Sequence, residues 1–106
     1  ELVPGVQVPF SELRGQSSYH IMPVLLPKGT DKLAVMASMK AQGIQTSWHY
    51  PPVHTFSIYA KGWQAQVNPL PLTESVATRE LTLPLYPTMT EEQVRMVVEG
   101  LRDSSR

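Results

Sequence analysis

The chain is 106 residues long, 42% hydrophobic and free of cysteine, so one small domain is expected and disulfides, cysteine–zinc sites and thiol chemistry are excluded. Nine Lys and Arg balance nine Asp and Glu, and this zero net charge argues against nucleic acid or an anionic membrane surface as a partner. No apolar run is long enough to span a bilayer, and the lack of a signal-like start favours a cytoplasmic protein.

The chain opens on a proline- and glycine-containing stretch, residues 1–18, with no sustained hydrophobic period. We expect it to be an extended lead-in from an upstream domain that is missing from this chain, with Val6–Phe10 pairing at a sheet edge. Residues 19–26 are rich in β-forming apolar side chains and predict a strand. Pro23 removes one donor from that strand, which suits an edge position or a bulge.

A strand–helix–strand unit is expected to continue from there. The helix is predicted over 31–42, because Thr30 or Asp31 can cap its first turn and Gly43 suits a left-handed C-terminal stop. Residues 44–50 alternate in part between apolar and polar side chains and predict a second strand, which a pair of prolines ends.

The second half of the chain contains shorter elements. Residues 53–62 predict a short helix or an aromatic-lined loop, and residues 63–72 a proline-broken connector. Thr73 is expected to cap a short helix that ends at Arg79. Residues 81–85 then predict a brief strand.

The last helix, predicted over 90–102, has the clearest signal. Thr90 and Gln93 have the spacing of a capping box, and apolar residues follow at i, i+3, i+4 and i+7. The whole pattern predicts an α+β fold, with a small, mostly antiparallel sheet flanked by helices. The residues expected in its core from the two long helices are Leu33, Met36, Val94, Val97, Val98 and Leu101.

The densest group of chemically versatile side chains follows the predicted 44–50 strand. His49, Tyr50 and His54 come together at the end of that strand, where ligands of α/β sheets tend to bind. A histidine can donate to a carbonyl or a phosphate, or move a proton near neutral pH. The same segment could instead be a rigid aromatic turn that closes the core. A metal site on the two histidines is disfavoured, because their spacing matches no common ligand pattern.

No catalytic set is evident elsewhere in the sequence. Arg79 could bind a carboxylate or phosphate, although pairing with a neighbouring acid is the more common role. The chain has no phosphate-binding loop, no nucleophile elbow and no pair of acids placed for acid–base work. None of its lysines is expected to lie in an apolar setting that would depress its pKa for Schiff-base chemistry. These lysines are Lys28, Lys32, Lys40 and Lys61.

Three stretches, in this order, resemble the DegT/DnrJ/StrS-type PLP-dependent nucleotide-sugar aminotransferases. They are Gly43-Ile44 followed by His49–His54, then Leu70–Glu74 with Ala77 and Arg79, then Leu81–Thr90 leading into Val94 and Val97. The resemblance implies that residues 19–106 form a small C-terminal domain like that of the fold type I aminotransferases. It also implies an N-terminal domain, absent here, that carries the pyridoxal phosphate and its lysine, and a homodimeric full-length protein.

The resemblance implies an enzyme that moves an amino group from glutamate or glutamine to a nucleotide-linked keto-sugar. His49, Tyr50 and His54 are then the candidate substrate-binding residues: the first two approach the substrate side of the cleft and the third orders the loop. With no catalytic, cofactor-binding or metal-binding residue assigned, the isolated chain is expected to be inactive. The alternative is a free-standing α+β module that binds a small ligand or a protein.

Overall fold

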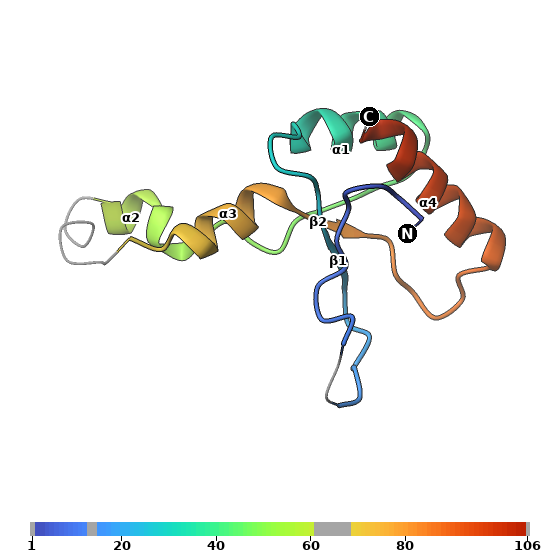
Figure 1. The fold of residues 1–106 in the computed structure, drawn as a ribbon, viewed down its shortest axis with the longest axis horizontal. Helices are drawn as coiled ribbons and strands as arrows, with labels where there is room; N and C mark the ends of the chain where they lie inside the picture. The colour runs from blue at the N-terminus through green and yellow to red at the C-terminus, as the bar shows by residue number, and fades with distance from the viewer. Residues whose placement is uncertain (1, 13–14, 61–68, 106) are drawn as a thin grey trace.

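The computed structural model describes residues 2–12, 15–60 and 69–105. It has the predicted α+β character, with a two-stranded antiparallel sheet and helices around it (Figure 1). No helix in these ranges is both long and apolar enough to cross a membrane. In chain order the elements are β1 (Met22–Leu25), α1 (Lys32–Ala41), the 3-10 turn η1 (Val53–Thr55), α2 (Ser57–Ala60), α3 (Pro71–Arg79), β2 (Glu80–Leu83) and α4 (Glu91–Ser104).

Both strands are shorter than predicted. β1 and β2 pair with Met22 opposite Leu83 and Leu25 opposite Glu80. β1 cannot begin at Tyr19, because this residue has a left-handed backbone with φ of 50°. β2 follows α3 directly and ends before the proline at position 84.

Residues 44–50 were predicted to form a strand, and this prediction is wrong. Only Ser47 pairs with β2, in an isolated antiparallel bridge to Thr82. Continuing that register would place His49 opposite Glu80 and Pro84 opposite residue 45. Pro84 has no N–H to donate, and the His49 N–H donates to the Glu80 side chain instead of to a strand carbonyl. The ladder therefore stops on both sides of Ser47.

The N-terminal stretch contacts the other edge of the sheet. Gln7 forms a bridge to Leu25, with both backbone hydrogen bonds present at 3.0 and 2.8 Å. This pairing lies within the stretch predicted to meet a sheet edge. Arg102 of α4 adds a second anchor, because its guanidinium donates to the Leu2 carbonyl at 2.9 and 3.1 Å.

The cap of α1 agrees with the prediction, but its buried face does not. Asp31 accepts hydrogen bonds from the first turn, and Gly43 has the expected positive φ of 78°. The buried residues are Val35 and Met39, at 2% and 0% exposure, whereas Leu33, expected in the core, is 63% exposed. Val35 and Met39, one helical turn apart, belong to the core cluster, and Leu33 lies outside that stripe.

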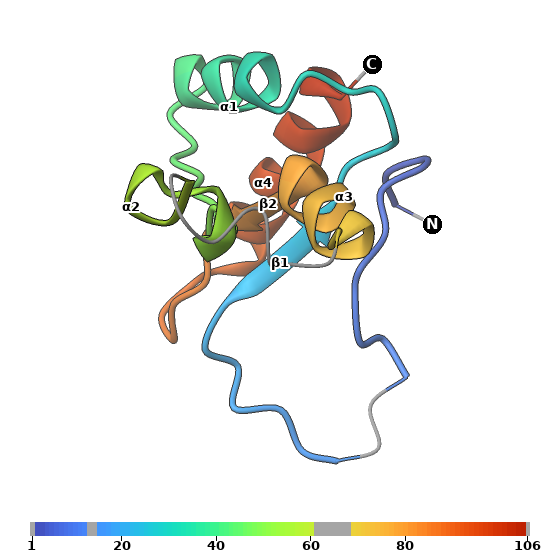
Figure 2. The same ribbon diagram turned by 90° about the vertical axis from the view of Figure 1, so that its left-hand side faces the viewer.

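α4 shows the same pattern of correct cap and partly wrong face. Thr90 and Gln93 form the predicted capping box, with hydrogen bonds of 3.2 and 2.9 Å. Val97 and Leu101 are buried as predicted, but Val94, one turn earlier, is 47% exposed. The helix therefore contacts the core through its C-terminal half, where it packs against α1 (Figure 2).

The core lies between the sheet, α1 and α4, while η1, α2 and α3 form an arm that projects from it (Figure 1). The radius of gyration is 15.7 Å, against about 13 Å for a compact domain of this length. α3 begins at Pro71 with Leu70 at the N-cap position, so the predicted cap at Thr73 is wrong. Proline suits the first helical position because it has no N–H to leave unpaired. Most of the predicted 63–72 connector lies outside the described residues.

Candidate functional site

His49 is held in place by two side chains of β2. Its backbone N–H donates to Glu80 Oε2 at 2.9 Å, and its ring Nδ1 lies 2.8 Å from Thr82 Oγ1. The Thr82 hydroxyl in turn donates to Glu80 Oε1 at 2.6 Å. Three polar groups from two distant parts of the sequence thus form one connected network.

The β2 side of this network is buried, whereas His49 is half-buried. Glu80 and Thr82 are 7% and 6% exposed. Strand side chains alternate between faces, so these two residues share one face of β2, while Leu81 and Leu83 share the other and belong to the core. Such buried polar side chains are tolerated when they are hydrogen-bonded, and each of these has a partner.

Tyr50 lies beside His49 at the edge of a hollow. The two rings meet edge to face, with centroids 4.7 Å apart. A hollow of about 330 Å³ opens there, lined by His49, Tyr50, Pro52, Leu72, Val76 and Glu80 among others. Tyr50 is 73% exposed, so its phenol is available to a ligand at the mouth of the hollow. Sequence reasoning placed these two residues at one site, and the structure brings them together.

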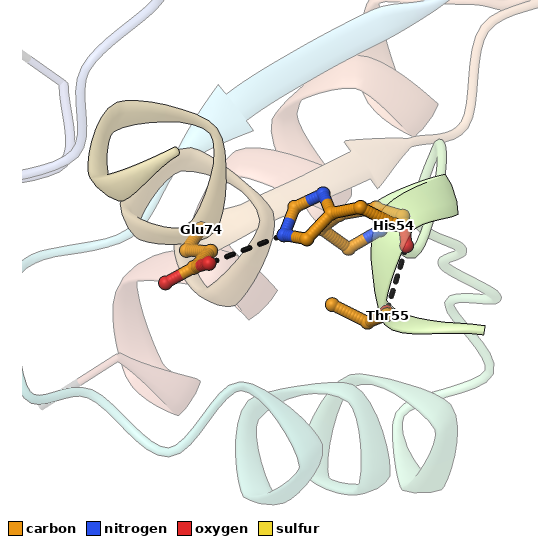
Figure 3. Close-up of polar contacts among 4 residues, drawn as sticks. His54, Thr55 and Glu74 are labelled. Atoms are coloured by element: carbon orange, nitrogen blue, oxygen red, sulfur yellow. Dashed lines mark hydrogen bonds and ion pairs between the residues drawn. The ribbon is translucent and has the colours of Figure 1, made fainter. Parts of the chain in front are cut away.

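His54 is positioned differently from the other two predicted site residues. Its Nε2 lies 3.1 Å from Glu74 Oε1, which joins η1 to α3 (Figure 3). Next to it, the Thr55 hydroxyl donates to the Pro52 carbonyl at 2.7 Å. His54 does not line the hollow. The contact between His54 and Glu74 holds η1 against α3, and Pro52, which precedes η1, lines the hollow.

Lys32 departs from the expectation that no lysine would have a depressed pKa. Its Nζ donates to the Ala77 carbonyl at 2.7 Å and lies 4.8 Å from the centroid of the Trp48 ring. Burial lowers the pKa of Lys32 below its ordinary value, and the charge of Glu80 opposes this by favouring the protonated form. Because the ammonium already has a carbonyl and an aromatic ring as partners, we assign it no cofactor-binding role.

Arg79 serves the fold rather than a ligand. Its Nε donates to the Leu26 carbonyl at 2.6 Å, and Nη2 lies 3.4 Å from Gln7 Oε1. The expected pairing with a neighbouring acid is therefore wrong, and the guanidinium instead ties α3 to the end of β1. In the described ranges, no three residues of the metal-ligating types gather into a cluster.

Sequence reasoning missed Glu80 and Thr82. A signal existed, because Glu80-Leu81-Thr82-Leu83 alternates polar and apolar residues. A strand that alternates in this way has one polar face. That this face would be buried and directed at His49 depends on contacts between residues 31 and 33 positions apart. No local pattern encodes such contacts.

Comparison with known proteins places these residues in a wider context. Residues 1–102 match the model of the DegT/DnrJ/EryC1/StrS aminotransferase family. The dTDP-4-dehydro-2,3,6-trideoxy-D-glucose 4-aminotransferase of Saccharopolyspora spinosa is 35% identical over 99 residues, which are 92% of this chain and 24% of that protein. The chain spans about a quarter of the length of the curated relatives it matches.

Solved structures show the same fold. DesV of Streptomyces venezuelae matches with a TM-score of 0.77 and 28% identity, over 95% of this chain and 26% of that chain. Helicobacter pylori PseC, an aminotransferase involved in the biosynthesis of pseudoaminic acid, matches with a TM-score of 0.86 and 23% identity, over 96% of this chain and 28% of that chain. At this level of identity, the second likeness concerns the fold alone.

Proposed function

The chain belongs to the DegT/DnrJ/EryC1/StrS aminotransferase family, and from this premise we propose that it is the small C-terminal domain of a homodimeric aminotransferase. The longer protein would move an amino group from glutamate or glutamine to a nucleotide-linked keto-sugar. Support comes from the S. spinosa relative, whose name specifies a dTDP-linked sugar substrate. A family match over residues 1–102 favours this proposal over a free-standing binding module.

Pyridoxal phosphate would supply the amino-group chemistry in the longer protein. The lysine, acid and phosphate-binding groups that hold it would come from the domain upstream, in the roughly three quarters of the relatives' length that this chain does not span. The partly buried ammonium of Lys32 already donates a hydrogen bond to the Ala77 carbonyl. The part of this chain would be to bind and orient the sugar substrate.

The observation that carries the proposal is the fixed imidazole of His49 beside the exposed phenol of Tyr50 at one hollow. Imidazole and phenol can each donate or accept a hydrogen bond, which suits the hydroxyls of a sugar. Because Glu80 and Thr82 already hold the His49 segment, little conformational entropy is left to lose on binding. His54 would act through the loop, by keeping η1 against α3.

The proposal predicts a selective defect in the full-length enzyme. Replacing His49 with Ala should weaken nucleotide-sugar binding by on the order of 1–2 kcal/mol, the value of one lost hydrogen bond. The cofactor spectrum and the half-reaction with the amino donor should stay unchanged. His20→Ala is the matched control, since this exposed histidine lies apart from the hollow. Loss of cofactor with unchanged sugar affinity would show that His49 serves the cofactor side.

A second test uses the 106-residue chain alone. Titration with pyridoxal phosphate should give no saturable, stoichiometric visible absorbance and no transamination of a nucleotide-linked keto-sugar. A stoichiometric coloured complex with activity would show that the chain contains its own cofactor site, and the proposal of an upstream cofactor domain would fall.

A further inference from the structure

We propose that Glu80 and Thr82 are positioning residues that keep the proton of neutral His49 on Nδ1. The free Nε2 then accepts a hydrogen bond from a hydroxyl of the sugar, rather than donating to the diphosphate. The identity of the ligand rests on the proposed function. The position of the proton follows from the hydrogen-bond network alone and can be tested without any substrate.

The argument begins with the protons available to the network. An ionised carboxylate can only accept hydrogen bonds, and a threonine hydroxyl has a single proton to donate. The Thr82 hydroxyl gives that proton to Glu80 Oε1 at 2.6 Å. Toward His49 it therefore offers only lone pairs. The 2.8 Å contact between Thr82 Oγ1 and His49 Nδ1 is then a hydrogen bond donated by Nδ1–H.

Both carboxylate oxygens of Glu80 face hydrogen-bond donors. Its second oxygen accepts the His49 backbone N–H at 2.9 Å, so each carboxylate oxygen faces a donor. The carboxylate therefore acts only as an acceptor in this network. The ammonium of Lys32 adds a favourable charge interaction from the side of α1.

The network is also sheltered from competing water. Glu80 and Thr82 are almost completely buried, and hydrogen bonds in such surroundings are stronger than in water. A ring nitrogen whose partner is fixed in this way determines which tautomer the histidine adopts. The same network thus sets both the orientation of the His49 ring and the position of its proton.

The remaining ring nitrogen is free to meet a ligand. Within the described ranges, His49 Nε2 has no hydrogen-bond partner, and it is not a buried unpaired atom. His49 lines the hollow. A neutral imidazole with the proton on Nδ1 can only accept at Nε2. A sugar hydroxyl can donate to it, whereas an ionised phosphate oxygen would set one lone pair against another.

The first experiment reads the proton directly in the full-length protein. Long-range ¹H–¹⁵N correlation of ¹⁵N-histidine-labelled protein at neutral pH, with His49 assigned by comparison with His49→Gln, reports which ring nitrogen is protonated. We expect Nδ1–H in the wild type and in Thr82→Ser, which keeps the hydroxyl, and a shift toward Nε2–H in Thr82→Val. A wild-type signal of the Nε2–H tautomer would overturn the inference, and this measurement decides even if Thr82→Val does not fold.

The second experiment tests the consequence for binding. Thr82→Val should raise KM for the nucleotide-sugar about 2- to 10-fold, the weight of one hydrogen bond. Affinity for the nucleoside diphosphate alone should not change, and Thr82→Ser should restore the wild-type KM. An equal loss of nucleoside diphosphate affinity would place the His49 contact at the phosphates and overturn the assignment. If the tautomer is as expected but His49→Ala leaves sugar affinity unchanged, the proposed function fails and the tautomer assignment stands.

Discussion

Gly100 of α4 lies against Ile44, at the start of the segment that leads toward His49. It is buried, and a Cβ built there would overlap the Ile44 Cδ1 methyl and lie 3.1 Å from Gln42 Oε1. Gln42 is exposed and can move aside. Ile44 is only 3% exposed, so its methyl has little room. The main obstacle to alanine at position 100 is therefore a steric clash with the Ile44 Cδ1 methyl group.

The expected energies can be estimated for each variant. Overpacking a core typically costs about 1–3 kcal/mol, and alanine gains roughly 0.8–1.0 kcal/mol over glycine within a helix. Gly100→Ala should therefore lower the free energy of unfolding by about 0–2 kcal/mol. Ile44→Val removes Cδ1 and should cost about 0.5–1.5 kcal/mol by itself. In that background alanine fits, and Gly100→Ala should stabilise the chain by up to about 1 kcal/mol.

Urea denaturation of the wild type, both single variants and the double variant measures this coupling. The effect of Gly100→Ala should change by about 1–3 kcal/mol between the wild-type and Ile44→Val backgrounds. Val24→Ala provides the control, because this β1 side chain is not among the atoms nearest Gly100 and its combination with Gly100→Ala should be additive. The same cost for alanine at position 100 with and without the Ile44→Val substitution would refute the reasoning.

Three further predictions concern the site's support and the core. A double-mutant cycle of His54→Ala and Glu74→Ala should give a coupling of only about 0.2–1 kcal/mol in the free energy of unfolding, because Glu74 is 56% exposed. Zero coupling would contradict the contact. Burial lowers the pKa of Lys32 in the folded chain below the ordinary value of 10.5. Between the folded and the unfolded pKa of Lys32, the unfolded chain binds more protons, so the free energy of unfolding should rise with pH in that range. In Lys32→Met, denaturation at a series of alkaline pH values should no longer show that rise. If the rise persists, a group other than Lys32 causes it. Val97→Ala should cost about 1–3 kcal/mol, but Val94→Ala less than about 0.5 kcal/mol; equal costs would contradict the observed face of α4.

For α1 and α4, the sequence predicts the N-terminal caps better than the buried faces, for a physical reason. Capping is local: the side chains of Asp31 and Thr90 satisfy N–H groups two or three residues ahead. Which stripe is buried depends on where the partner element lies. Leu33 and Val94 both lie near apolar stripes of their helices, yet they are 63% and 47% exposed because no partner element in the described ranges covers them.

The site shows the same division between local and distant information. His49 and Tyr50 could be placed together from the sequence, because they are neighbours beside a rigid proline pair. The groups that determine what the imidazole can do, Glu80 and Thr82, come from the other half of the chain. The bridge between Ser47 and Thr82 brings them close to His49. The sequence pattern predicted a full strand there instead of a single bridge.

The end of that pairing and the formation of the site are one structural event. With Ser47 opposite Thr82, an uninterrupted ladder would bring the His49 N–H to the backbone of residue 80. The Glu80 carboxylate accepts that N–H instead. The chain therefore leaves the sheet at His49, the residue whose ring the network orients. The alternation of β2 makes this possible, because it directs Glu80 and Thr82 toward the departing segment while Leu81 and Leu83 remain in the core. A strand with apolar side chains at positions 80 and 82 would preserve the core and lose both the fixed imidazole and the defined proton on it.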